Sequence, residues 1–149
     1  MDNLTTVEPL SAPPNYVDQI ETVIASMAAE DSAMVNRSGA SVLWKFRYGT
    51  VEVFVQLTGS TDEDTLTVWS PVLPLPAKDE AALFRELLTL NWLATFEAHF
   101  AIAENGVVVV ATRTVAELSP GEISRAITLV ASIADEQDES LLARFGQGS

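Results

Sequence analysis

The chain has 149 residues, 48% of them hydrophobic, and carries a formal net charge of −13 from 21 acidic and 8 basic residues. This length and apolar content suit one globular domain with one core, and the negative charge disfavours nucleic acid partners because it repels phosphates. The chain contains no cysteine, which excludes disulfides, thiol nucleophiles and thiolate metal sites.

Residues 1–14 contain no periodic pattern, and three prolines interrupt them. We expect a flexible N-terminal arm there, followed by a single domain over residues 15–146. Asn15 is suited to cap a helix, because its side chain can accept a hydrogen bond from the first free backbone N–H groups. The residues that would form the apolar face of this first helix are Tyr16, Ile20, Val23, Ile24 and Met27.

Strand-like alternation between Ala40 and Leu73 predicts three antiparallel strands, with turns at Gly49-Thr50 and at residues 59–64. Pro71, Pro74 and Pro76 remove backbone donors, so Ser70–Lys78 is expected to be a connecting loop. One face of this sheet is apolar throughout. The other face, which water would normally cover, carries Leu43, Phe54 and Trp69.

These three side chains have two interpretations. The arm, the proline-containing loop or a second copy of the chain covers them, or they receive an extended segment of a protein partner. We therefore predict Leu43, Phe54 and Trp69 as partner-binding residues, with the acidic surroundings favouring a basic segment.

The most apolar stretch is Leu83–Ile102, which we expect to be a helix that leads directly into a strand. Apolar side chains surround nearly the whole helix, so it should be covered on most sides. Phe96, Phe100 and Ile102 then alternate as in a strand. Asn91 within the helix is either a binding residue or a buried polar group bonded to nearby backbone, and the second role is commoner.

Asn105-Gly106 predicts a hairpin turn. The strand Val107–Val115 follows it, and the first residues of this strand are apolar on both of its faces. Ser119-Pro120-Gly121-Glu122 predicts a capped helix start, and the last helix should end near Gly146. The elements together predict an α+β fold of helices packed on an antiparallel sheet in two layers, in the order α-β-β-β-α-β-β-α. The surplus apolar surface predicts a homodimer, with an interface formed by Leu88, Trp92, Val108 and Val110.

Catalytic chemistry has no motif in this sequence. His99 is the only histidine, and no glycine-rich phosphate loop or calcium-binding loop is present. We therefore expect no enzymatic activity, no cofactor and no metal. The longest apolar span, Ala81–Ile102, contains charged residues that disfavour a membrane helix, and the start lacks the features of a secretion signal. The chain is expected to be cytoplasmic, and its acidic runs to be solvated surface.

Several segments resemble the YbjN-domain proteins, a bacterial sensory transduction regulator type. They are Leu90-Asn91, Phe100-Ala101-Ile102, Asn105-Gly106 with Val107-Val108-Val109, Leu118–Glu122, Ala134-Asp135 and Phe145-Gly146. The resemblance implies a fold like that of type III secretion chaperones, which are small acidic dimers that bind extended segments of effector proteins. It implies no catalytic residues.

Two functions of different classes remain open at this point. The first is a non-enzymatic, chaperone-like or regulatory module that binds a protein partner through apolar surface. The second is a small-ligand sensor or enzyme with a pocket between sheet and helices. Exposed apolar patches would favour the first function, and an enclosed cavity with converging polar groups would favour the second.

Overall fold

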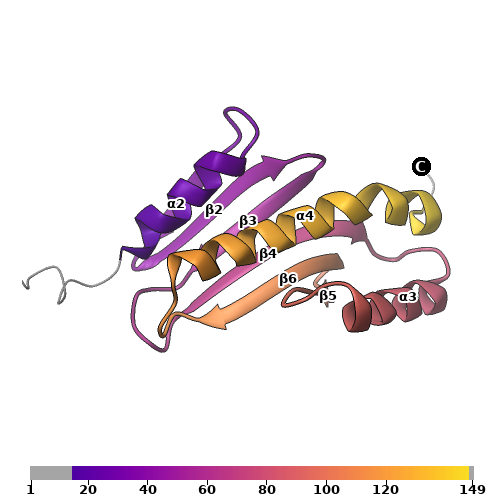
Figure 1. The fold of residues 1–149 in the computed structure, drawn as a ribbon. Coiled ribbons are helices and arrows are strands. Elements are labelled where there is room, and N and C mark those ends of the chain that lie inside the picture. Colours follow the sequence, from indigo (N-terminus) through magenta and orange to yellow (C-terminus); the bar gives the residue numbers. More distant parts are fainter. Residues whose placement is uncertain (1–14, 148–149) are drawn as a thin grey trace, which may run out of the picture.

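The computed structural model describes residues 15–147, in which three helices accompany one six-stranded antiparallel sheet (Figure 1). The elements in chain order are α2 (Tyr16–Met27), β1 (Met34–Ser38), β2 (Ser41–Tyr48), β3 (Val51–Leu57), β4 (Thr65–Pro74), α3 (Glu80–Leu93), β5 (His99–Ala103), β6 (Gly106–Thr114) and α4 (Pro120–Phe145). The strand order is β1-β2-β3-β4-β6-β5, so β1 and β5 are the edge strands. The predicted α+β class is confirmed, and the predicted arm, residues 1–14, lies outside the described residues.

Helices α2 and α4 pack side by side on one face of the sheet, which we call the inner face (Figure 1). The alternation predicted from the sequence places apolar side chains on this face, where α4 crosses β3, β4 and β6. Fully buried side chains include Phe46, Val53, Val55, Val68, Ile123, Ile127 and Leu141. Each side chain of this kind contributes about 1.5–3 kcal/mol on burial, so the inner face holds the fold together.

Helix α4 begins at the predicted capping box, in which the Ser119 and Glu122 side chains each accept a backbone N–H. The helix continues without interruption through the acidic segment. Asp135 in that segment accepts hydrogen bonds from the backbone N–H (2.9 Å) and hydroxyl (3.0 Å) of Thr50 in the β2–β3 turn. Gly49 has a positive φ of 57°, and a Cβ there would come within 2.2 Å of Asp135. Asp135 therefore fixes this turn on α4, a structural role that charge patterning alone did not predict.

The structure adds one strand to the predicted order. β1 pairs with β2 from Met34↔Lys45 to Ser38↔Ser41, and every residue of β1 is exposed. An edge strand without a buried face has no need of alternating apolar and polar residues. The sequence therefore carried no periodic signal for β1.

Strand β4 extends to Pro74, so the prediction that Ser70–Lys78 is entirely a loop was wrong. The backbone pairing of β4 with β3 ends at Trp69, and beyond it β4 pairs with β6 alone, with a register shift between Pro71 and Leu73. A strand with one bonded neighbour and an irregular ladder can contain residues that lack an N–H. The Ser70 hydroxyl donates to the Glu52 carbonyl of β3 at 2.6 Å, where the backbone ladder has ended.

Candidate functional site

The sheet face opposite α2 and α4 is called the outer face here. The strand register aligns five of its side chains in one row, which are Lys45, Phe54, Trp69, Val110 and His99. The rings of Phe54 and Trp69 stack with centroids 5.2 Å apart and an interplanar angle of 10°. A stacked aromatic pair contributes about 0.5–1.5 kcal/mol beyond its burial. The structure thus brings together two of the three predicted partner-binding residues.

Leu43, the third predicted residue, also lies on the outer face. It pairs with Gln56, and this pair lies two residues along the strands from the Lys45–Phe54 pair of the row. Leu43 and Phe54 are therefore diagonal neighbours, close enough for large side chains to share a surface. Leu43, Phe54 and Trp69 are each half-buried.

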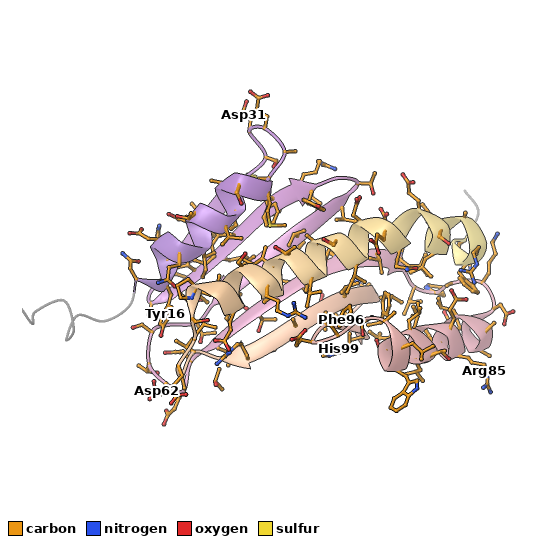
Figure 2. All side chains as sticks on the ribbon, viewed as in Figure 1. Tyr16, Asp31, Asp62, Arg85, Phe96 and His99 are labelled. Carbon is orange, nitrogen blue, oxygen red and sulfur yellow. The ribbon has the colours of Figure 1, made fainter. Side chains whose placement is uncertain are left out.

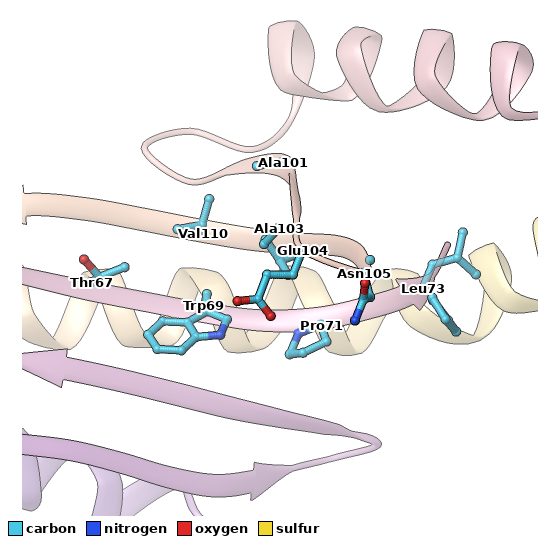
Figure 3. Close-up of a pocket in the computed structure, with 12 residues that line it drawn as sticks. Thr67, Trp69, Pro71, Leu73, Ala101, Ala103, Glu104, Asn105 and Val110 are labelled. Atoms are coloured by element: carbon cyan, nitrogen blue, oxygen red, sulfur yellow. The ribbon is translucent and has the colours of Figure 1, made fainter. Parts of the chain in front are cut away.

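An apolar groove of about 790 Å³ continues from Trp69 along the outer face, and we call it the outer groove (Figure 3). Its apolar lining comes from three strands, with Trp69 and Pro71 on β4, Val108 and Val110 on β6, and Ala101 and Ala103 on β5. Glu104 and Asn105 of the β5–β6 turn stand at one end. Val108 and Val110, predicted as dimer residues, therefore lie beside Trp69 in the groove.

Helix α3 presents the other two predicted dimer residues to solvent. Leu88 is 67% exposed and Trp92 is 84% exposed, whereas Leu83 and Leu87 are buried. The expectation that this helix is covered on most sides was therefore wrong for the described chain. The helix lies at the β5 end of the molecule (Figure 1), where only one of its sides packs on the body.

The two sets of predicted dimer residues border one apolar surface. Leu88 and Ala101 line a depression of about 370 Å³ between α3 and β5. Ala101 also lines the outer groove together with Val108. The apolar surface therefore runs from the exposed side of α3, across β5, to the outer groove.

Asn91 attaches α3 to the sheet. Its side-chain carbonyl accepts the Phe100 N–H at 2.8 Å, and its amide donates to the Phe100 carbonyl at 3.3 Å. Phe100 lies on edge strand β5, whose backbone groups on the free side would otherwise be open to pairing with another chain. The interpretation of Asn91 as a polar group satisfied by nearby backbone is confirmed, and the residue also protects the sheet edge.

Two ion pairs with α4 hold the region around α3. Glu86 of α3 accepts two hydrogen bonds from Arg144, which lower the pKa of this carboxyl group. Glu97, in the turn before β5, accepts two hydrogen bonds of 3.0 Å from Arg125, and they likewise lower its pKa. Sequence reasoning missed both pairs, since their members are 58 and 28 residues apart and the topology alone brings them together.

Phe96 lies in this turn and not in the strand to which its spacing assigned it (Figure 2). Its φ is positive at 56°, an uncommon conformation for a bulky residue, and the residue is 76% exposed. The Arg125 guanidinium lies 5.9 Å from the ring centroid. This cation–π contact and the Glu97 pair together hold the turn against α4.

The charges on the outer face are mixed. Glu52 of β3 pairs with Lys45 at 3.3 Å and with Arg47 at 3.0 Å, both on β2. His99 is exposed, and it ends the row of side chains that begins with Lys45. Among residues 15–147, no three histidine, aspartate or glutamate side chains lie close enough together to hold a metal ion. In the same part of the chain, no helix is both long and apolar enough to cross a membrane.

Comparison with known proteins agrees with this architecture. The YbjN family, described as "Putative bacterial sensory transduction regulator", matches residues 16–143. No curated protein sequence matches the chain. Among solved structures, a chain from the crystal structure of the ExsC–ExsE complex matches with a TM-score of 0.51 and 15% sequence identity, over 85% of this chain and 96% of that chain. That likeness concerns the fold, and it confirms the type III secretion chaperone-like fold implied by the resemblance. Because the family match spans nearly the whole described structure, the chain belongs to the YbjN family.

Proposed function

We propose that the protein is a non-enzymatic interaction module, chaperone-like or regulatory in role, that binds an extended segment of a protein partner in the outer groove. The observation that carries this proposal is an apolar groove of about 790 Å³ that adjoins the stacked Phe54–Trp69 pair. It lies on the face opposite the two helices that cover the sheet. Exposed apolar surface of this kind marks protein interaction sites in general.

The shape of the groove favours a chain segment over a small molecule. From Thr67 to Pro74 the groove follows β4 for seven residue steps, which correspond to about 23 Å at about 3.3 Å per residue. An extended segment of similar length fits such a channel, with alternate side chains directed at the sheet. A small-molecule site would instead enclose its ligand and direct a few polar groups at it.

The nature of the partner follows from the charge and from the fold. A net charge of −13 attracts a basic segment at long range. Close to the groove, Glu104 and the mixed charges of Lys45, Arg47 and Glu52 suit a segment that carries charges of both signs. The similar solved chain was crystallised in a complex named for two components, ExsC and ExsE, which supports a protein partner for this fold.

A photoreactive phenylalanine analogue at Val110 tests the proposal. Val110 lines the groove, whereas Thr22 is an exposed residue on α2, on the opposite side of the sheet, and serves as the control position. Irradiation in native lysate should give a discrete protein adduct from position 110 and none from position 22, and mass spectrometry should map it to one contiguous segment. Equal labelling at both positions, or none at position 110, would contradict the proposal.

We further propose that the protein is a homodimer that pairs through α3. Leu88 and Trp92 lie one helical turn apart on its exposed side, and Leu93, at the helix end, is 69% exposed. A cluster of large apolar side chains that includes tryptophan has the composition of an interface centre. The Asn91 amide and the Glu86–Arg144 pair hold the helix in place, so α3 offers a second copy a fixed surface.

A further inference from the structure

Another hollow, of about 270 Å³, lies between α4 and the strands β4 and β6, and we call it the inner pocket. It lies where the inward side chains of β6 become small. Val107 and Val109 are followed at the next inward position by Ala111, and α4 also places an alanine, Ala126, at the pocket. The alkyl lining of the inner pocket consists of Leu66, Ala111, Ala126 and Leu129.

Strand β5 stops short of the inner pocket. It pairs with β6 only from Gly106 to Val110, so within the described structure residues 111–114 of β6 have no strand on that side. Glu97, in the turn before β5, lines the pocket here. The charged side chains of the lining are all partly exposed, so a small solute can reach the pocket from water.

Two arginine–glutamate pairs line the inner pocket. Arg113 binds Glu122 at 2.8 Å and donates to two nearby backbone carbonyls at 2.9 Å each. Arg125 donates from Nε and Nη2 to the two carboxylate oxygens of Glu97, at 3.0 Å each. The Nη1 atom of Arg125 has no hydrogen-bond partner within residues 15–147. One edge of this guanidinium group is thus occupied, and the edge formed by Nη1 and the second N–H of Nη2 is available to a ligand.

The charges select the kind of anion that this edge can take. A hydrogen bond from Arg125 lowers the pKa of Glu97, and the backbone N–H of Ser119 lowers that of Glu122, so both carboxylates stay ionised at neutral pH. Their negative charge disfavours a dianion such as a phosphate monoester. A monocarboxylate carries less charge and can accept two parallel N–H bonds from one edge of a guanidinium group.

We infer that the inner pocket binds a small monocarboxylate with a compact apolar body, and that the carboxylate pairs with Arg125. The volume of about 270 Å³ holds about nine non-hydrogen atoms, at about 30 Å³ for each as in liquid water. The apolar body replaces water to which the alkyl lining offers no hydrogen bonds, which favours binding. This site is separate from the proposed partner site, because α4 and the outer groove lie on opposite faces of the sheet.

Titration of the isotope-labelled full-length protein with benzoate, followed by two-dimensional amide NMR, tests this inference. Benzoate fits the volume of the inner pocket, and benzamide has the same shape without the charge. Benzoate should shift the amide signals around Ala111 and Ala126 with a dissociation constant on the order of millimolar. Benzamide should bind at least about tenfold more weakly, because it lacks the charge-assisted bonds to Arg125.

Three variants locate the binding. Arg125→Gln removes the cationic edge and should weaken benzoate binding at least about tenfold. Arg144→Gln is the matched control, since Arg144 also lies on α4 and pairs with a glutamate, Glu86, away from the inner pocket. It should change the affinity by less than about twofold. Ala126→Leu fills the pocket with a larger side chain and should abolish the saturable shifts.

Three results would overturn the inference, and they are the absence of saturable shifts at the inner pocket, equal binding of benzoate and benzamide, and equal weakening by the Arg125 and Arg144 variants. The comparison of benzoate with benzamide uses the unaltered chain, so it decides the matter even if a variant fails to fold. The titration contains no protein partner, so its failure leaves the proposed function intact. Failure of cross-linking at Val110 would likewise leave the carboxylate site intact.

Discussion

Replacing Asn91 with leucine is expected to lower the free energy of unfolding by about 2–4 kcal/mol, because each unsatisfied polar group costs about 1–3 kcal/mol. Leucine is similar in size to asparagine but cannot accept the Phe100 N–H or donate to the Phe100 carbonyl. Both groups would be left without these bonds beside a helix that partly excludes water. Urea denaturation followed by circular dichroism measures the change.

Thr89→Ala is the matched control, since the Thr89 hydroxyl donates to the Arg85 carbonyl of its own helix and the residue is exposed. Its effect should stay within about 0.5 kcal/mol. The Asn91 variant should also aggregate more readily, because the free side of β5 becomes available for pairing. Equal stability of the two variants would show that the amide does not anchor α3.

Replacing Trp92 with glutamate is expected to weaken the proposed dimer about 30-fold or more, since loss of a central aromatic at an interface costs about 2 kcal/mol or more. Trp92 is 84% exposed in the single chain, so the monomer should keep its fold and its melting temperature. Sedimentation velocity over a range of protein concentrations measures the shift from dimer to monomer.

Val35→Glu is the control for the Trp92 variant, because it places the same charge at an apolar residue, 49% exposed, on the edge strand β1. It should sediment as the parent protein does. A parent that is monomeric at micromolar concentration, or a Trp92 variant that remains dimeric, would contradict pairing through α3. An unfolded Trp92 variant would be inconsistent with the exposure of this side chain.

The parts of the fold that the sequence predicted are those fixed by local physics. Strand alternation identified the inner residues of β2 and β3, and Ser119 with Glu122 marked the start of α4. Asn105-Gly106 marked the β5–β6 hairpin, although its two turn residues are Glu104 and Asn105, one position earlier than predicted, and Gly106 pairs with Ala103. Each of these signals lies within a few residues of the feature it specifies. β1 was missed because it has no buried face. The end of β4 was missed because it contains prolines, and because its pairing with β6, a strand far along the chain, cannot be read from the sequence.

The candidate site was predictable only in part, for a related reason. The alternation of side chains along consecutive antiparallel strands placed Phe54 and Trp69 on the same face. Their rings stack because the two residues pair across the adjacent strands β3 and β4. Val110 joins them only because β6 pairs with β4 although α3 and β5 intervene in the chain. The contacts of Glu86 and Glu97 with α4 depend on the same long-range topology.

The central claim, that the outer groove binds a partner segment, is tested most directly by combining Phe54→Ser with Trp69→Thr and measuring capture of the cross-linked partner. Val35→Thr with Leu142→Ser changes two exposed apolar residues away from the groove and is the control. The account predicts that capture by the groove variant falls at least about tenfold, equivalent to about 1.4 kcal/mol, while cooperative unfolding and dimer mass persist. Undiminished capture would contradict it, and so would an unfolded or monomeric groove variant, because the outer face would then be core or dimer interface.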